Sequence, residues 1–400
     1  MRRNLLALGL ASAFLAHAPV PVAQAAGQAA SWEPFVFPYD QIFPSLEISS
    51  ASMTSDEEEK DPTMIGDDMS MIGISMTATR PRQKVRVKVS LPSLMIDSVI
   101  DAELPRAGVD YVIYPRLRWD YQALGRVRQS RPETVSFEVS IDNGPAQVQV
   151  VRARVRSVND ALFSVDPDPE VDDDDLDFNW MFAAYVNEDS PLVDTILREA
   201  LDSEIVKSFD GFQSESQEQV YAQVFAIWYA LQQRGIRYSN ITATASTHQL
   251  VGSQNVRFIE QSWRNTQANC VDGSVLFASI LRKIDIAPVL VSVPGHMFVG
   301  FALDAEGEQY AYLETTMLGD DEAEDVSDEM QEQAEDISDD PDIQASYLVF
   351  AAAMNYGQEQ VDEGGDRFEA DDEVDYQMIN IQAARENGVM PITSETESRN

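Results

Sequence analysis

Cys270 is the only cysteine among the 400 residues, and His296 follows 26 positions later (296 − 270). A single cysteine cannot form a disulfide within the chain, so its thiol serves packing, a partner or chemistry. A thiol attacks an acyl group as the thiolate, which a helix N-terminus or a neighbouring histidine stabilises. The two residues therefore indicate nucleophilic cysteine chemistry, with Cys270 as the nucleophile and His296 as the base.

The elements around these residues are predicted to bring them together. Cys270 begins an apolar stretch with helical spacing that runs to Lys283. His296 opens an alternating stretch that predicts a strand, and a turn over 304–308 leads to a further predicted strand over 310–315. A strand that returns along the helix can present His296 to the helix start.

A histidine base needs an acceptor for its second ring nitrogen, which fixes the tautomer. Glu314 is the predicted acceptor, because residues opposite each other on adjacent antiparallel strands lie about 5 Å apart. Thr315 and Thr316 are weaker alternatives. His248 is a weaker candidate for the base, since it lies in a polar stretch that predicts a loop.

Each of these residues also has a structural interpretation. A lone cysteine is more often a small buried hydrophobe than a nucleophile. A strand histidine is more often structural, and a glutamate near a strand end is usually solvated. The order of helix, strand and strand, with Asn269 and Asp272 beside the thiol, favours the catalytic interpretation.

Several short motifs carry a resemblance to a known family. They are Asn269-Cys270-Val271-Asp272-Gly273, Leu276-Phe277-Ala278-Ser279, Pro294-Gly295-His296-Met297-Phe298-Val299-Gly300 and Leu313-Glu314-Thr315-Thr316, with Ser253-Gln254-Asn255-Val256-Arg257 upstream. Together they resemble the bacterial transglutaminase-like superfamily, whose members share a papain-like cysteine arrangement. The resemblance covers about residues 180 to 318. It departs from the family at Glu314, where members more often have Asp.

The resemblance implies acyl transfer from an amide through a thioester. Cys270 would be the nucleophile, His296 the base and then the acid, and Glu314 the group that orients the imidazole. The backbone N–H of Cys270 is the expected first donor to the oxyanion. The candidates for further oxyanion or substrate contacts are Gln254, Trp263, Gln267, Asn269 and Asp272.

There are three hypotheses for the function, and the two catalytic ones differ in the acceptor of the acyl group. Water would make the protein a peptidase or amidase that acts on a protein or peptide, and most bacterial relatives of this type hydrolyse. An amine acceptor would make it a protein-crosslinking acyltransferase. In the third hypothesis the chain is a non-catalytic binding or scaffold protein of the cell envelope that keeps the fold with an unreactive thiol.

The composition excludes some partners. With 68 acidic and 28 basic residues, the formal net charge of −40 repels nucleic acid and anionic lipid. Such a surface suits a salty habitat, where screening weakens self-repulsion. Clustered carboxylates at 172–175 and 320–342 could instead bind calcium, although neither run has the ligand spacing of an EF-hand. No cofactor is otherwise predicted.

The N-terminus resembles a secretory signal. Arg2 and Arg3 precede an apolar run from Leu5 to Ala18, and Ala23-Gln24-Ala25 offers a small-residue cleavage site. The run is shorter than the roughly 20 residues that span a bilayer. We expect a periplasmic or secreted protein without membrane insertion.

Between about 84 and 165 the chain alternates apolar and polar residues, which predicts strands with one buried face. The turn residues Asp142-Asn143-Gly144 predict a hairpin there. Helices are predicted to follow near 191–207 and 216–235. From Asp320 to Asp375 there are 22 acidic residues and one basic residue, Arg367, which suggests an extended, partly disordered insertion with one short helix.

The predicted class is therefore α+β. The expected divisions are a signal peptide at 1–25, a poorly ordered arm at 26–80, a β-sandwich-like domain at 81–165, an acidic linker at 166–177, a transglutaminase-like catalytic domain at 178–318, and an acidic insertion with a C-terminal extension at 319–400. The β-domain carries no catalytic set of residue types and would support the enzyme or bind an envelope partner.

Overall fold

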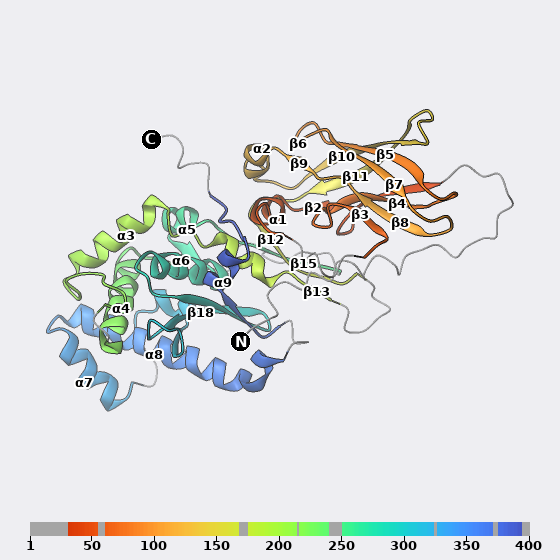
Figure 1. The fold of residues 1–400 in the computed structure, drawn as a ribbon. Helices are drawn as coiled ribbons and strands as arrows, with labels where there is room; N and C mark the ends of the chain where they lie inside the picture. The colour runs from red at the N-terminus through yellow and green to blue at the C-terminus, as the bar shows by residue number, and fades with distance from the viewer. Residues whose placement is uncertain are drawn as a thin grey trace. The chain divides into compact units, whose positions relative to one another are not determined.

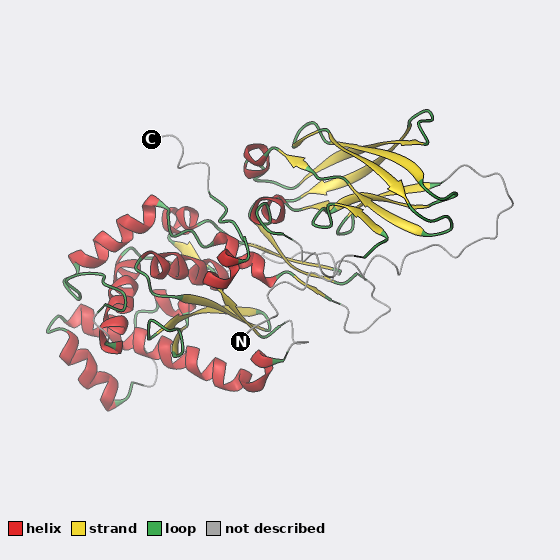
Figure 2. Ribbon diagram, in the orientation of Figure 1, coloured by secondary structure: helices red, strands yellow, loops and turns green. Residues whose placement is uncertain are grey.

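The computed structural model describes residues 31–54, 61–167, 175–213, 216–239, 250–323, 326–370 and 375–393. The fold is mixed α+β, as predicted (Figures 1 and 2). The chain divides into two compact units, Met1–Phe178 with Ser246–Ser253, and Asn179–Ala245 with Gln254–Asn400. Three predicted features lie outside the described residues: the signal peptide at 1–25, His248 and the acidic residues 172–174.

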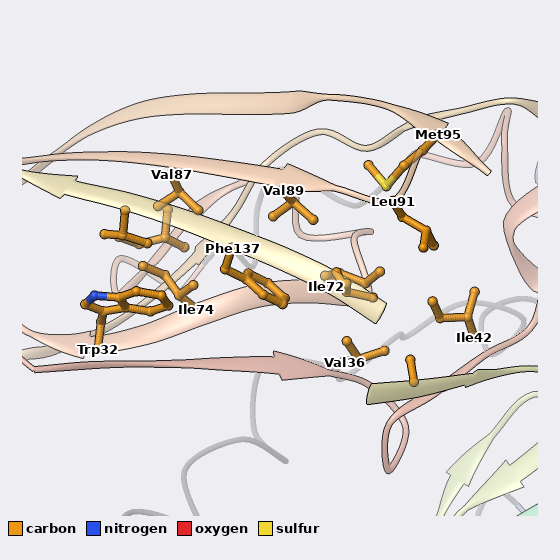
Figure 3. Packing of buried hydrophobic residues seen from close by; sticks show 14 of the residues in the cluster. Trp32, Val36, Ile42, Ile72, Ile74, Val87, Val89, Leu91, Met95 and Phe137 are labelled. Atoms are coloured by element: carbon orange, nitrogen blue, oxygen red, sulfur yellow. The ribbon is translucent and has the colours of Figure 1, made fainter. Parts of the chain in front are cut away.

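Two sheets of the first unit share one hydrophobic core. One sheet has the strand order β1-β4-β8-β3 and the other has the order β2-β11-β10-β5-β7. Figure 3 shows Trp32 and Ile74 from the first sheet packed near Val87 and Phe137 from the second. The strands are β1 (Trp32–Val36), β2 (Gln41–Ile42), β3 (Met64–Gly66), β4 (Ile72–Thr77), β5 (Gln83–Ser90), β7 (Ser98–Leu104), β8 (Asp110–Tyr114), β10 (Arg131–Ile141) and β11 (Gln147–Val155).

Smaller elements complete this unit. A three-stranded sheet has the order β13-β12-β15, and β6 pairs with β9. These elements are β6 (Met95–Ile96), β9 (Arg118–Trp119), β12 (Asp160–Val165), β13 (Leu176–Asp177) and β15 (Val251–Asn255), with helices α1 (Pro44–Ser49) and α2 (Tyr121–Gly125). The end of the expected linker is thus a short strand, because Leu176 and Asp177 pair with β12.

The predicted hairpin is confirmed. Strands β10 and β11 pair with Val139 opposite Gln147, and the connection between them contains Asp142 and Asn143. Both residues have a positive φ, 54° and 58°. Aspartate and asparagine tolerate this left-handed conformation better than most residues, which explains why this sequence turns there.

The prediction of a poorly ordered arm at 26–80 is wrong for the residues described there. Strands β1 and β4 both contribute to the core, and Trp32 and Val36 are buried. The sequence does not predict β1, because Pro34 interrupts the alternation of apolar and polar residues that is typical of a strand. A proline is tolerated here because β1 is the edge of its sheet, where a missing N–H breaks no ladder.

The second unit is built on an antiparallel sheet with the order β19-β18-β17-β20. Helix α6 packs along β18, and α8 packs along β19 (Figure 1). The strands are β17 (Pro288–Val293), β18 (His296–Ala302), β19 (Tyr310–Leu313), β20 (Gln377–Asn380), β14 (Arg237–Tyr238) and β16 (Gln267–Ala268). The helices are α3 (Pro191–Asp202), α4 (Gln217–Gln233), α5 (Ile259–Asn265), α6 (Cys270–Lys283), α7 (Asp328–Ile337), α8 (Pro341–Gly364) and α9 (Ile381–Glu386), with short 3₁₀ helices η2 (Asn179–Tyr185), η3 (Thr315–Gly319) and η4 (Gly365–Glu369).

The prediction of an extended acidic insertion is also wrong. The segment forms α7 and the 24-residue helix α8. Residues Ile343, Ser346, Phe350, Ala353 and Gly357 are buried and recur every three or four positions, so they form one apolar face that packs inward. The acidic residues dominate the composition, but those of α7 and α8 are all exposed. The segment is therefore part of the second unit.

In the described part of the chain, none of the helices combines the length and the apolar character that a bilayer-spanning helix needs.

Candidate active site

Cys270 is the first residue of α6, and the preceding residue caps that helix. The Asn269 side chain accepts a hydrogen bond from the Asp272 backbone N–H at 2.8 Å, and the Asp272 carboxylate accepts one from the Asn269 N–H at 3.1 Å. This reciprocal capping box fixes where the helix begins. It places Cys270 at the N-terminal, positive end of the helix.

Asp272 is held further by an ion pair. Its carboxylate accepts from the Arg257 backbone N–H at 2.7 Å and contacts the Arg257 guanidinium at 2.5 Å. Burial raises the pKa of Asp272, and the bonds from Arg257 and Asn269 oppose that rise. The candidates Asn269 and Asp272 thus use their side chains to build the start of α6, so their contribution to the site is to position Cys270.

His296 is placed by a tight turn. Val293 of β17 pairs with His296 of β18, so Pro294 and Gly295 form a two-residue connection. Gly295 has a φ of +74°, a conformation that favours glycine over other residues. The turn therefore puts His296 at the first position of β18, next to Phe298, whose ring centroid lies 6.2 Å from that of His296.

Glu314 immediately follows β19 and caps the 3₁₀ helix η3. The register pairs Leu313 with Val299, which brings the residue after Leu313 to the His296 end of β18. One carboxylate oxygen of Glu314 accepts from the Thr316 N–H at 2.9 Å and from the Thr316 hydroxyl at 2.6 Å. Glu314 is 1% exposed, so these bonds satisfy a buried carboxylate.

The three predicted catalytic residues meet at His296. Its Nε2 lies 2.5 Å from Oε2 of Glu314. The Cys270 side chain lies close enough to the ring to raise the pKa of His296. Since Nε2 faces Glu314, Nδ1 is the nitrogen left for the sulfur. The structure therefore brings together Cys270, His296 and Glu314 in the order of a nucleophile, a base and an orienting carboxylate.

The environment of His296 favours its charged form. Burial, the largest single influence, lowers its pKa, but hydrogen bonds and charge attraction from Cys270 and Glu314 together raise it to about 10. The structure therefore holds a positively charged ring beside the side chain of Cys270.

A cleft of about 500 Å³ adjoins His296. Its lining residues are Arg237, Tyr238, His296, Thr316, Met317, Gly319 and Asp320. Tyr238 is close enough to the catalytic groups that, after burial, the negative charges of Cys270 and Glu314 also raise its pKa. Sequence reasoning missed Arg237 and Tyr238. The short strand β14 that carries them has no periodic pattern, and its pairing with β16 and its packing on η3 place it beside the site.

The three further oxyanion candidates lie on other elements. Gln254 lies on β15 and Gln267 on β16, and both are half-buried. Trp263 lies on α5, where the Arg234 guanidinium stacks 4.5 Å from its ring centroid. Among the described residues, none of the three lines the cleft at His296. The backbone N–H of Cys270 remains the donor that the helix start provides.

Within the described residues, no group of three or more His, Cys, Asp or Glu side chains is arranged to share a metal ion. Comparison with models of known protein families, with curated proteins and with solved structures finds no significant match. An assignment of function therefore depends on the residues and geometry of the site.

Proposed function

We propose that the chain is an exported cysteine hydrolase of transglutaminase-like type, a peptidase or amidase that works through Cys270, His296 and Glu314. The observation that carries this proposal is the position of His296, whose Nε2 lies 2.5 Å from the buried carboxylate of Glu314 and whose ring is close enough to Cys270 for that side chain to raise its pKa. The sequence motifs around these residues add the resemblance to the family. The N-terminal signal pattern supports export.

In the first half of the proposed reaction, the Cys270 thiolate attacks the carbonyl carbon of an amide. The C–S bond forms, and the carbonyl electron pair moves to oxygen, which the N–H groups at the start of α6 stabilise. When this intermediate collapses, the C–N bond breaks and the His296 imidazolium gives its proton to the leaving nitrogen. The products are a thioester on Cys270 and a free amine.

The second half needs His296 as a base. Formation of the thioester removes the negative charge of Cys270, which is one of the influences that raise the pKa of His296. The pKa of the ring therefore falls at the step where the ring must accept a proton. Neutral His296 takes a proton from water as the water oxygen attacks the thioester, and collapse releases the acid and restores the thiolate and the imidazolium.

The test is the pH dependence of alkylation. We expect iodoacetamide to modify Cys270 with a midpoint well below pH 8 and faster than it modifies a free thiol at the same pH. Peptide mapping identifies the site, and Cys270→Ala is the blank. A midpoint at or above 8.5, or protection from the reagent, would instead support the hypothesis of a non-catalytic scaffold.

Product analysis separates hydrolysis from crosslinking. A glutamine-containing protein such as casein is incubated with the enzyme in the presence and absence of a labelled primary amine. Hydrolysis predicts new carboxylates or chain ends and no label. Incorporation of the amine would make the protein an acyltransferase and would reject the hydrolase proposal.

A further inference from the structure

The cleft beside His296 lies on the side of the site where a leaving group must be. In the proposed reaction, the proton of the imidazolium goes to the leaving nitrogen, so that group must sit against the ring. Among the described lining residues of the cleft, His296 is the triad member, and Cys270 is outside the set. The cleft therefore extends from the imidazole, and its contents would be the amine part of the substrate.

Arg237 supplies the guanidinium of this cleft, and its backbone and aliphatic side-chain atoms are packed on two sides. Its backbone pairs with Gln267 in the two-stranded sheet that leads to Cys270. On the other side lies Gly319, where an added Cβ would come within 2.9 Å of the Cα, Cβ and Cγ of Arg237. The absence of a side chain at Gly319 thus lets the η3 segment lie flat on the arginine stem.

The guanidinium itself remains accessible. Its Nη2 lies 3.2 Å from a carboxylate oxygen of Asp321, but the two side chains are 63% and 82% exposed. Exposed ion pairs of this kind contribute little stability, so a substrate carboxylate can compete with Asp321. A planar guanidinium also offers several donors to a carboxylate. The chain carries 68 acidic residues, so a positively charged group is uncommon on it. The Arg237 guanidinium in this cleft therefore suits an anionic ligand.

We propose that this cleft is the leaving-group subsite and that Arg237 binds a carboxylate carried by the departing amine. The substrate class is then an amide whose nitrogen belongs to an amino acid with a carboxylate near the bond that breaks, such as a C-terminal residue. This inference rests on the proposed function and adds the specificity that the triad alone does not give.

The experiment measures the alkylation of Cys270 by a matched pair of reagents, iodoacetate and iodoacetamide. They differ in a carboxylate, and neither requires knowledge of the substrate. Rate constants for both reagents are measured at one pH and ionic strength. The iodoacetate-to-iodoacetamide ratio is then compared between the wild type and Arg237→Gln. Arg234→Gln is the matched control, because it removes the same charge three residues away, where the side chain stacks on Trp263.

We expect Arg237→Gln to lower the iodoacetate-to-iodoacetamide ratio about three- to five-fold, the range of one exposed charge-assisted contact. Arg234→Gln should change the ratio less than two-fold, and Arg237→Lys should keep most of it. An unchanged iodoacetamide rate shows that the variant is folded with an intact site.

Three results would overturn the inference while leaving the proposed function intact. The first is an equal iodoacetate-to-iodoacetamide ratio in Arg237→Gln and the wild type, and the second is an equal fall of this ratio in both arginine variants. The third is labelling of Cys270 by 2-bromoethylamine that is faster in the wild type than in an Asp320 variant, which would assign the cleft to a cation. Slow labelling of Cys270 by every reagent would reject the proposed function itself.

Discussion

At His296, burial and two negative partners act in opposite directions on one ring. Burial alone would favour the neutral imidazole, but Glu314 and Cys270 reverse that preference. The carboxylate of Glu314 is itself fixed by two bonds from Thr316, so it cannot turn away from the ring without losing them. The protonation of His296, on β18, is therefore set by Cys270 at the start of α6 and by Glu314 at the N-cap of η3.

Glu314→Gln tests this balance. Removing the carboxylate charge should lower the pKa of His296 below the wild-type value of about 10. NMR titration of the imidazole signals can measure the change, since the chain has three histidines and His296→Gln identifies the resonance. A midpoint that stays near 10 in Glu314→Gln would mean that Glu314 does not control the ring.

The same shift predicts how stability depends on pH. The folded pKa of His296 lies above its unfolded value of 6.5, so the stability that the charged ring contributes is complete below pH 6.5 and is lost as the pH rises through about 10. The difference in the free energy of unfolding between the wild type and Glu314→Gln should shrink over this interval. Urea unfolding at pH 6.5 and 9.5 measures it, and a difference that grows with pH would contradict the assignment.

Cys270→Ala tests whether the thiol serves the core. Cys270 is only half-buried, and the substitution removes one atom, so the free energy of unfolding should fall by about 1 kcal/mol or less. Urea unfolding at neutral pH is the measurement. A loss of several kcal/mol would show that the residue is there for packing, which is the interpretation that its scarcity and position argue against.

At the scale of elements, the start of α6 depends on Asp272. The carboxylate caps the helix and pairs with Arg257 while 1% exposed. Asp272→Ala should lower the free energy of unfolding by about 3 kcal/mol or more, because it removes the buried carboxylate that pairs with the Arg257 guanidinium and caps α6. Asp189→Ala, at an exposed carboxylate 3.9 Å from Lys283, should cost less than about 0.5 kcal/mol. Similar costs for both variants in urea unfolding would contradict this role.

Helix α8 packs on strand β19, which directly precedes Glu314. The Glu314 N–H donates to the Ala353 carbonyl at 3.1 Å, and a Cβ at Gly357 would lie 2.8 Å from the Tyr312 carbonyl carbon and oxygen. Alanine gains up to about 1 kcal/mol over glycine from helix propensity. The backbone contact should outweigh that gain, because α8 must move away from β19 to admit the methyl group.

Gly357→Ala should therefore lower the free energy of unfolding by about 1–3 kcal/mol and raise the pH midpoint of Cys270 alkylation, since displacement of β19 weakens the Glu314–His296 contact. Gln358→Ala, at an exposed neighbouring position of α8, is the control and should change neither. Greater stability of Gly357→Ala with an unchanged midpoint would show that α8 does not position Glu314.

The elements that the sequence predicts well are those with one strong local pattern. The helix from Cys270 to Lys283 and the hairpin around Asp142 and Asn143 form as predicted, because capping and turn residues mark their ends. Long-range placement was not predictable from such signals. Strand β14 acquires its position from β16, and α8 buries one face of a segment whose overall composition is acidic.

The candidate site follows the same division. Cys270, His296 and Glu314 were predictable because each lies at the end of a recognisable element. Arg237 and Tyr238 were not, since their relation to the thiol comes from a two-residue strand pair and from the approach of Gly319. The predictions of a poorly ordered arm at β1 and an extended insertion at α8 were wrong, because burial there depends on neighbours far along the chain.

At the scale of the whole chain, the second unit is closed by its C-terminal residues. Strand β20 pairs with β17, which makes it an edge of the sheet that carries His296. Ile379 and Ile381 are buried, and the Ile392 N–H donates to the Ala184 carbonyl at 2.7 Å. Residues 377–393 thus belong to the core that supports the triad, although they follow Glu314 by more than sixty positions.

A chain that ends at Tyr376 should therefore fail to form a stable catalytic unit. It loses β20, exposes the edge of the apolar strand β17, and leaves the half-buried Glu188 without Arg385. We expect a large loss of soluble protein and rapid, unselective alkylation of Cys270, because unpaired apolar edges associate. A chain that ends at Thr393 keeps all of these contacts and is the control. Equal thermal unfolding midpoints for the two chains would show that the sheet is complete without its fourth strand.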